Sequence, residues 1–284
     1  MTSPHPLVSV IIPTYNQAAL LQKALQSVIS QTCTDWEAIV IDNHSTDDTK
    51  EVVESIHDGR IKYVAFSNNG IIAASRNYGI NLAVGNYIAF LDSDDLWYPS
   101  KLYSCLKFLG GGADAVCHGL RIRREDIWGE SFLPDLIQHD LYHHLLYNGN
   151  SCIATSAVVL KKECLTRFGC FSQDPEIVTA EDYELWLRLS KNGIRWGFIP
   201  ELLGEYRIHG GNASGNIRKQ MQAEETVVKK YFVEDNLFSS SDNRLKRKKR
   251  RMMIAFRAGK RSLDSGFFWD AVSYALQGIV KIWG

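Results

Sequence analysis

Three aspartates follow one short apolar run in the segment YIAFLDSDDLW. Asp92, Asp94 and Asp95 come directly after the strand-like residues 87–91. Asp92 and Asp94 are two positions apart on an extended turn, so their carboxylates can face the same ion. Mg²⁺ and Mn²⁺ prefer such oxygen ligands, and substrate phosphates can fill the remaining coordination positions. The alternative is a solvated turn in which Asp95 caps the helix that follows.

A second acidic pair, Glu181 and Asp182, opens an amphipathic helix predicted over residues 179–193. A carboxylate at this place can act as a general base that takes the proton from an attacking hydroxyl group. The alternative is helix capping, because acidic side chains in a first turn are stabilised by the helix dipole. The pair by itself leaves both interpretations open.

Three further side chains have types suited to a phosphate-bearing substrate. Asp42 can accept hydrogen bonds from a nucleobase or ribose, or it can form an Asx turn. Arg76 can pair with a phosphate or with an aspartate of the site, and the alternative is a weak surface ion pair. His209 can bind a metal or a diphosphate, or it is a surface histidine beside a turn. The sequence contains neither a Walker motif nor GxGxxG, so a metal and side chains would have to bind the phosphates.

The elements that must position these residues alternate over the first 120 positions. Short β-branched runs predict strands, and amphipathic patterns between them predict helices. The strands are expected at 7–12, 36–41, 61–66, 87–91 and 113–118, and the helices at 18–30, 46–57, 71–83 and 99–109. This alternation predicts a parallel sheet covered on both faces. Pro99 is expected at the first position of the fourth helix.

Each of the first four predicted strands runs into a polar segment. Ligands of parallel sheets bind beyond the carboxyl ends of the strands. We therefore expect the four segments to converge on one crevice: PTYN (13–16), DNHSTDDT (42–49), SNNG (67–70) and DSDD (92–95).

The rest of the chain is less regular up to residue 174 and helical after residue 214. CIATSAVVLKKECL (152–165) reads as a strand followed by the start of a helix. WGFIP and LLGEYRIH read as short strands or extended segments. From these patterns we expect a domain over 1–215, with a nucleotide-binding half at 1–120 and an acceptor half at 121–215. A helical extension over 216–284 follows.

Composition and charge exclude several classes. The 284 residues are 45% hydrophobic and 23% charged with no net charge, as in soluble globular proteins. No signal-peptide pattern opens the sequence, and no run reaches the roughly 18 apolar residues of a membrane span. Six cysteines without a CxxC or metal-ligand spacing predict reduced, buried thiols and a cytoplasmic protein.

The charge is concentrated at one end. Residues 244–284 hold eleven Lys or Arg and two Asp, a net charge of +9, and the remainder carries −9. One interpretation is that RLKRKKRR (244–251) and the apolar segment after it contact an anionic membrane surface. The other is a helical hairpin packed on the body, its cations solvated and its apolar side chains buried: Phe267, Phe268, Trp269, Tyr274 and Ile279. No nucleic-acid partner is expected, since no recognised binding fold accompanies the run.

Five segments resemble, in order and spacing, the family 2 glycosyltransferases. They are VSVIIPTYNQAALLQKALQSVISQT, EAIVIDNHSTDDT, NNGIIAASRNYGINLAVGNYIAFLDSDDLW, EDYELWLRLSKNG and YRIHGGNAS, within residues 7–214. The resemblance implies an α/β fold of GT-A type, with a Rossmann-like, mostly parallel sheet and helices on both faces. It also implies a nucleotide-sugar donor, a divalent cation (Mn²⁺ or Mg²⁺) and inversion at the anomeric carbon.

On the donor side, the resemblance implies that Pro13, Tyr15 and Asn16 line the nucleotide pocket. Asp42 matches the aspartate that reads the base, and Arg76 matches the basic residue near the donor.

On the reaction side, Asp92, Ser93 and Asp94 match the DXD motif, with Asp94 as the direct metal ligand. His209 matches a position that faces the diphosphate and the metal. Glu181 and Asp182 match the ED motif, in which Asp182 is the base. One departure is visible, since many members have a second acid where this chain has Asn43.

We therefore expect an inverting, metal-dependent glycosyltransferase acting on a nucleotide sugar, UDP-sugars favoured. The acceptor is expected to be a hydroxyl group of a glycan or a lipid-linked sugar in polysaccharide biosynthesis, reached from the inner face of the cytoplasmic membrane. Two rival classes are kept. A nucleotidyltransferase usually carries a Gly-rich basic loop after the first strand, which PTYNQAAL lacks. A non-enzymatic binder of sugar nucleotides would not need Glu181 and Asp182.

Overall fold

The computed structural model describes residues 6–124, 127–134, 140–149, 153–209, 216–235, 241–264 and 268–283. The chain divides into two compact units, which are described separately. The first comprises 1–137, 151–171 and 188–209, and the second comprises 138–150, 172–187 and 210–284. The functional division at residue 215 stays a prediction.

The first unit is built on four parallel strands. β1 (Val8–Thr14), β2 (Trp36–Asp42), β3 (Ile61–Ala65) and β4 (Tyr87–Phe90) lie in the order β3-β2-β1-β4. All three pairings are parallel, and the register places Thr14 beside Asp42 and Ile11 beside Phe90. These are the first four predicted strands, and their carboxyl ends lie at one edge of the sheet.

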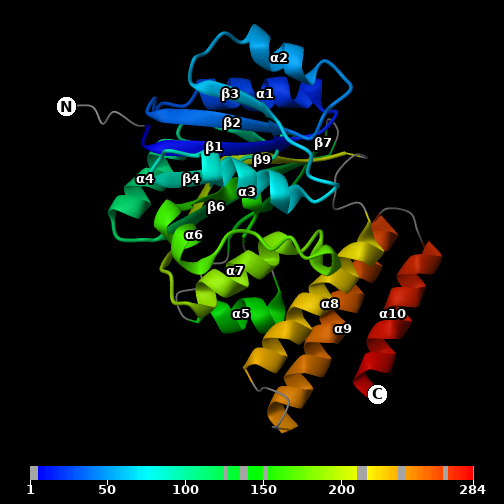
Figure 1. Ribbon diagram of the computed structural model, residues 1–284. Coiled ribbons are helices and arrows are strands. Elements are labelled where there is room, and N and C mark those ends of the chain that lie inside the picture. The colour runs from blue at the N-terminus through cyan, green and yellow to red at the C-terminus, as the bar shows by residue number, and fades with distance from the viewer. Residues whose placement is uncertain are drawn as a thin grey trace. The chain divides into compact units, whose positions relative to one another are not determined.

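Helices cover both faces of these strands (Figure 1). Val8, Val10 and Ile12 of β1 share a buried cluster with Leu21 and Leu25 of α1 (Ala18–Ile29). On the opposite face, Gly79 of α3 (Ile72–Leu82) approaches β1 so closely that a Cβ would lie 2.6 Å from Ile11. Because successive strand residues point to opposite faces, the two helices pack on opposite sides of β1.

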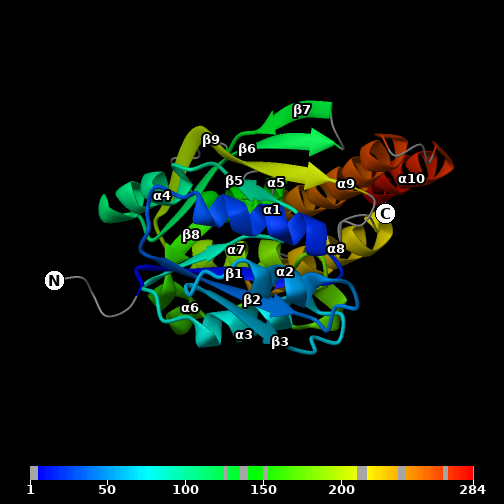
Figure 2. The ribbon, with the colours of Figure 1, turned by 90° about the horizontal axis from the view of Figure 1, so that it is seen from above.

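The sheet becomes mixed beyond β4. β8 (Val158–Lys161) pairs antiparallel with both β4 and β6 (Ala115–Arg124), and β9 (Trp196–Ile208) pairs parallel with β6. β5 (Leu96–Trp97) and β7 (Ile127–Phe132) add antiparallel edges to β9 and β6. Figure 2 shows β6, β7 and β9 curling away from the parallel strands. The run of parallel neighbours thus ends at β4, because the later segment β8 separates the fourth and fifth predicted strands.

Two local predictions in this unit are corrected. WGFIP and LLGEYRIH form one strand, β9, whose register against β6 shifts between Ile199 and Leu202. Pro200 lies in that shift, where its missing N–H breaks no regular ladder. The fourth helix, α4 (Lys101–Gly110), begins after Pro99, whose carbonyl instead accepts the N–H of Thr32 at 2.8 Å.

The remaining helices of the first unit are short. α2 (Thr49–Ser55) follows β2, and α6 (Lys162–Phe168) follows β8, which is preceded by the 3-10 turn Thr155–Ala157. The strand and helix predicted within 152–165 are thus confirmed, with Cys152 outside the described residues. The other five cysteines are free, and Cys105, Cys117 and Cys164 are buried.

The second unit is helical. It contains α5 (Leu141–Asn148), the 3-10 turn Pro175–Ile177, residues 181–187 of α7 (Glu181–Lys191), α8 (Ile217–Glu234), α9 (Ser241–Asp264) and α10 (Phe268–Trp283). α9 packs between α8 and α10 and also contacts α5 (Figure 1). The predicted C-terminal helices are confirmed, and no described helix is long and apolar enough to cross a membrane.

Helices α9 and α10 form a C-terminal hairpin, which can be compared with the two interpretations of the tail, a membrane contact or a packed helical hairpin. Gly259 and Gly278 let α9 and α10 approach closely, and Tyr274 is buried. The placements of Phe267 and of the Phe268, Trp269 and Ile279 side chains lie outside the described set. The expectation that the cations are solvated is wrong for Arg250, which is 0% exposed. In place of water, the Arg250 guanidinium binds the Glu224 carboxylate and the main-chain carbonyl of Leu146.

Candidate functional site

The loops at the carboxyl edge of the parallel strands are tied together by hydrogen bonds. After β1, the Asn16 N–H donates to Ser45 Oγ (2.8 Å), and Asn16 Oδ1 accepts the Thr46 N–H (2.7 Å). Asn16 has φ = 50°, a left-handed conformation that Asn tolerates. Pro13 is buried and Tyr15 is 55% exposed. The predicted convergence of the first two strand ends is confirmed.

The third and fourth strand ends join the same edge. Asn43 Oδ1 accepts the N–H of Asn68 at 2.9 Å, which links the loops after β2 and β3. The Ser93 hydroxyl, after β4, donates to Gln17 Oε1 just before α1. Asn43 replaces the second acid of the family pattern, and here its neutral amide holds the neighbouring loop.

Asp42 is 1% exposed and surrounded by donors. Its carboxylate accepts the N–H and O–H of Ser45 and, at 2.7 Å, the hydroxyl of Tyr63. Burial and then the Asp42 carboxylate raise the pKa of Tyr63, so the phenol stays protonated as a donor. Its local bonds are made to Ser45, three residues on, and together with Tyr63 they hold the side chain at the end of β2.

Arg76 lies beside the acid loop and not on the surface. Its side chain is 5% exposed, and Nη2 donates to Asp92 Oδ1 at 2.7 Å. Its guanidinium carbon is 5.3 Å from the Phe171 ring centroid. Asn77 fixes that ring by pairing with both the N–H and the carbonyl of Phe171 (3.0 and 2.8 Å). The alternative of a surface ion pair is therefore wrong for Arg76, because the side chain is buried against Phe171 and Asp92.

Asp94 and His209 meet although they are far apart in the sequence. His209 Nε2 lies 3.0 Å from Asp94 Oδ2, and the two side chains are 27% and 13% exposed, respectively. Burial, followed by the negative charge of Asp92, raises the pKa of Asp94, while His209 acts in the opposite direction. The structure thus brings Arg76, Asp92, Ser93, Asp94 and His209 together.

Asp95, which the sequence suggested as a helix cap, has a different role. It is 1% exposed, and its Oδ1 accepts the N–H of Arg207 on β9 at 3.0 Å. Burial, and then Asp94 and Asp92, hold the pKa of Asp95 well above its usual range. The N-cap of α4 is Ser100, so the capping interpretation is wrong. Asp95 instead links the acid loop to β9, the strand that ends just before His209.

The donor set of this cluster fits a hard divalent cation that also binds phosphate. Asp94 offers carboxylate oxygen, His209 offers imidazole nitrogen, and Asp92 adds a second carboxylate in the same loop. Each of two neighbouring carboxylates makes the ionised form of the other less favourable, and a bound cation makes both ionised forms more favourable. Among the described residues no three His, Cys, Asp or Glu side chains form a complete metal site. The remaining ligands would come from phosphate and water, as is common for Mg²⁺.

The Glu181–Asp182 pair lies in the second unit, after a strained turn. Thr179 has φ = 84°, rare for a β-branched residue, and its N–H donates to Glu181 Oε2 at 2.7 Å. Glu181 is 6% exposed, whereas Asp182 is the more accessible carboxylate and accepts the N–H of Tyr183 (2.6 Å). Strained backbone at such a place is typical of functional sites. Glu181 holds the turn, and Asp182 is the more exposed of the two carboxylates.

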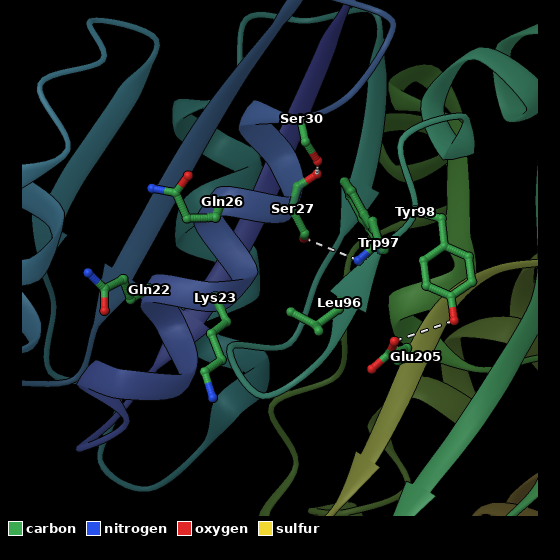
Figure 3. A pocket seen from close by; sticks show the side chains of 9 residues that line it. All are labelled: Gln22, Lys23, Gln26, Ser27, Ser30, Leu96, Trp97, Tyr98 and Glu205. Atoms are coloured by element: carbon green, nitrogen blue, oxygen red, sulfur yellow. Dashed lines mark hydrogen bonds between the residues drawn. The ribbon is translucent and has the colours of Figure 1, made fainter. Parts of the chain in front are cut away.

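A cavity of about 500 Å³ opens beside α1 in the first unit (Figure 3). Strands β5 and β9 contribute Trp97 and Glu205 to its wall, and the Tyr98 hydroxyl lies 3.4 Å from Glu205 Oε1. None of the predicted site residues lines this cavity, whose walls are Gln22, Lys23, Gln26, Ser27, Ser30, Leu96, Trp97, Tyr98 and Glu205.

Comparison with known proteins defines the class. Residues 9–167 match the family described as "Glycosyl transferase family 2". A putative teichuronic acid biosynthesis glycosyltransferase, TuaG of Bacillus subtilis, is 32% identical over 76% of this chain and 84% of its own length. The Escherichia coli UDP-Glc:alpha-D-GlcNAc-diphosphoundecaprenol beta-1,3-glucosyltransferase WfgD is 33% identical over 81% and 88%. The chain is a glycosyltransferase and belongs to glycosyltransferase family 2.

Solved structures support the fold. Staphylococcus aureus TarS 1-349 in complex with UDP-GlcNAc has a TM-score of 0.63 at 15% identity, covering 94% of this chain and 90% of that one. The mannosyltransferase PcManGT of Pyrobaculum calidifontis, in complex with GDP-Man and Mn2+, has a TM-score of 0.64 at 18% identity, covering 99% and 88%. The GT-A fold with a C-terminal helical extension is thereby confirmed.

Proposed function

We propose that this glycosyltransferase is inverting and uses a divalent cation to transfer a sugar from a UDP-sugar to a hydroxyl group of a lipid-linked saccharide. One observation carries the donor side of the proposal. The Asp92–Asp94–His209 cluster, with the buried Arg76, lies at the carboxyl edge of a parallel sheet. The nucleotide-sugar substrate and lipid-linked acceptor follow the name of WfgD, which is 33% identical.

The residues have separate roles in the proposed donor site. Asp94 and His209, with Asp92, would hold Mn²⁺ or Mg²⁺, which when bound neutralises the diphosphate leaving group. Arg76 holds Asp92 in place. Pro13, Tyr15 and Asn16 would line the nucleotide pocket, where the exposed Tyr15 ring offers a face for the base. Asp42 and Ser93 would shape the pocket through the turns they anchor.

Asp182 is proposed as the general base. Its carboxylate takes the proton of the acceptor hydroxyl as that oxygen forms a bond to the anomeric carbon. The bond from the same carbon to the diphosphate oxygen breaks, and the diphosphate leaves with the electron pair. Attack opposite the leaving group inverts the anomeric centre. The accessibility of Asp182, compared with the buried Glu181, supports this assignment.

A donor and acceptor screen tests the proposal. The full chain is incubated with UDP-, GDP- and dTDP-sugars, Mn²⁺ or EDTA, and a short-chain analogue of a GlcNAc-diphosphate lipid. We expect UDP release coupled to a β-linked product from an α-linked donor, and loss of turnover with EDTA. Nucleotide transfer with release of diphosphate would indicate a nucleotidyltransferase, and tight donor binding without turnover a non-enzymatic binder. A retained anomeric configuration would contradict inversion.

We also propose that the enzyme works at the cytoplasmic face of a membrane, through the exposed part of the basic run. Arg244, Lys246, Lys249 and Arg251 are exposed on α9, together with Leu245. Each basic residue near an anionic surface contributes about 1 kcal/mol. Co-sedimentation with phosphatidylglycerol vesicles at low salt, and release at high salt, is expected. Equal binding to neutral phosphatidylcholine vesicles, or no binding, would contradict this contact.

A further inference from the structure

Arg250 is the buried member of the basic run at residues 244–251. Its side chain is 0% exposed, whereas Lys249 and Arg251 on either side are exposed. A guanidinium removed from water needs compensating partners, because an unpaired buried charge is strongly destabilising. A surface contact does not require this residue, so its partners indicate a separate role.

Those partners come from three other helices of the second unit. Arg250 Nε donates to the Leu146 carbonyl of α5 at 3.1 Å, and Nη2 donates to Glu224 of α8. Nη2 also lies 3.4 Å from the Tyr183 hydroxyl of α7, which itself donates to the Leu145 carbonyl at 2.8 Å. One guanidinium therefore joins the end of α5, the first turn of α7 and the middle of α8.

The end of α5 is shaped to receive arginine. Gly149, its C-cap, has φ = 88°, and a Cβ there would lie 2.6 Å from guanidinium nitrogens of both Arg250 and Arg257. Arg257, two helical turns further along α9, donates to the Asn148 carbonyl. Cations are favoured at a helix C-terminus because its last carbonyls carry partial negative charge. The glycine and the two arginines form one packed arrangement.

The first turns of α7 are also held from α8. Glu184 is 1% exposed, and its Oε1 accepts the Tyr231 hydroxyl at 3.0 Å and lies 3.4 Å from Lys230 Nζ. Tyr183 and Glu184 directly follow Asp182 in the helix. Restraining these two side chains restrains the backbone that carries the Asp182 carboxylate.

We propose that Arg250 is a positioning residue for sugar transfer. Acting through Tyr183, it fixes the first turn of α7 and so orients the Asp182 carboxylate toward the acceptor hydroxyl. This inference rests on the proposed role of Asp182 as general base. The basic run then has two separate roles. Arg250 orders the first turn of α7 from the interior of the second unit, and its exposed neighbours contact the proposed anionic membrane surface.

The test compares Arg250→Met with the control Arg218→Met in the full chain, because Arg218 is an exposed arginine of α8 that lies outside the basic run. We expect kcat of Arg250→Met to fall about 10- to 100-fold, as for a displaced catalytic group, with the KM for UDP-sugar unchanged. Arg250→Lys should not restore kcat, because an ammonium cannot reproduce the guanidinium fork. Arg218→Met should match the wild type. An unchanged kcat in Arg250→Met, or equal losses in the two Met variants, would overturn the proposal.

A second comparison separates positioning from general damage to the fold. In an Asp182→Asn background, Arg250→Met should not lower the residual rate further, because there is no base left to position. A further loss of the same size would show that Arg250 acts only through the fold. If Arg250→Met does not fold, as judged by circular dichroism, Tyr183→Phe takes its place in both comparisons. If Asp182→Asn itself keeps the wild-type kcat, the proposed base fails whatever Arg250 does, and the positioning role fails with it.

Discussion

The two acidic sites of this chain divide their tasks in the same way. In the Asp92–Asp95 loop the most buried carboxylate, Asp95, binds a main-chain N–H of β9. In the turn before α7 the buried Glu181 binds the main-chain N–H of Thr179. In both places a buried acid binds a main-chain N–H, and a more accessible acid lies next to it, to which we assign the proposed chemistry. Acids that are adjacent in the sequence therefore differ in burial and in hydrogen bonding.

The sites differ in how their charge is compensated. The loop has two cationic or ionisable partners, Arg76 on Asp92 and His209 on Asp94. The turn lies at a helix N-terminus, whose free N–H groups favour negative charge, and it follows a strained residue. The first arrangement is consistent with the proposed cation and diphosphate site. The second is consistent with the proposed general base, a single carboxylate held in a fixed direction.

The strongest way to break this comparison is to neutralise the proposed base. Asp182→Asn keeps the shape of the side chain but cannot accept the proton, and we expect kcat to fall about 10²- to 10⁴-fold. Calorimetry with UDP and Mn²⁺ should show unchanged affinity. Glu181→Gln is the matched variant and should retain most of kcat, since its amide oxygen can still accept the Thr179 N–H. Loss of UDP affinity in Asp182→Asn would contradict the assignment.

A smaller effect, on binding, is expected at the loop. Asp94→Asn removes a proposed metal ligand, and we expect Mn²⁺-dependent UDP affinity to fall about 10- to 100-fold. Asp95→Asn preserves an acceptor for the Arg207 N–H and should retain more of that affinity. Titrations with and without EDTA separate the metal-dependent part. Equal losses in the two variants would show that the division between buried and reactive acids does not hold here.

The smallest effect on activity is expected at a buried charge outside both sites. Lys101 of α4 is 0% exposed, with Nζ 3.4 Å above the Trp97 ring, and burial lowers its pKa to about 7. An unfolded lysine keeps its proton to about pH 10.4, so between pH 7 and 10 the unfolded chain binds more protons than the native one. Stability therefore rises with pH in this window, by at most about 1.4 kcal/mol per pH unit.

Lys101→Met should abolish this rise, stabilise the protein at pH 7 and leave kcat unchanged. Urea unfolding at pH 7 and pH 9 measures the effect. The exposed Lys107→Met, on the same helix, is the control and should keep the rise. A loss of activity in Lys101→Met would mean that the buried Lys101 charge contributes to the reaction. Charge compensation at the Asp92–Asp95 loop would then not be limited to Arg76 and His209.

The local predictions from sequence succeeded where neighbouring residues decide the outcome. The first four strands and the helices between them were predicted because β-branched runs and 3.6-residue periodicity are local patterns. The meeting of four polar strand ends followed from the geometry of parallel sheets. The end of the helix predicted over residues 179–193 was equally local, because α7 ends at Lys191 and Gly193 just after it has φ = 75°.

The predictions that were wrong or missing share one physical cause, which is pairing between residues that are far apart in the sequence. β8 separates β4 from β6 although it is formed some 40 residues after β6 begins, and no local pattern carries that pairing. The alternative in which Asp95 caps the next helix is wrong, and the true partner of Asp95, the Arg207 N–H, is 112 positions away in the sequence. Arg250 looked like one solvated cation among seven.

By itself, the sequence determined the types of side chain available for chemistry, the strands and helices that carry them, and the family to which the chain belongs. Only the tertiary structure decided which members of each acidic run are buried and which cation is removed from water. The reason is that burial depends on the whole set of packed neighbours, and a pKa or an ion pair follows from burial. Arg250 shows the difference most clearly: in sequence it is indistinguishable from Arg251, and in the fold it binds three helices.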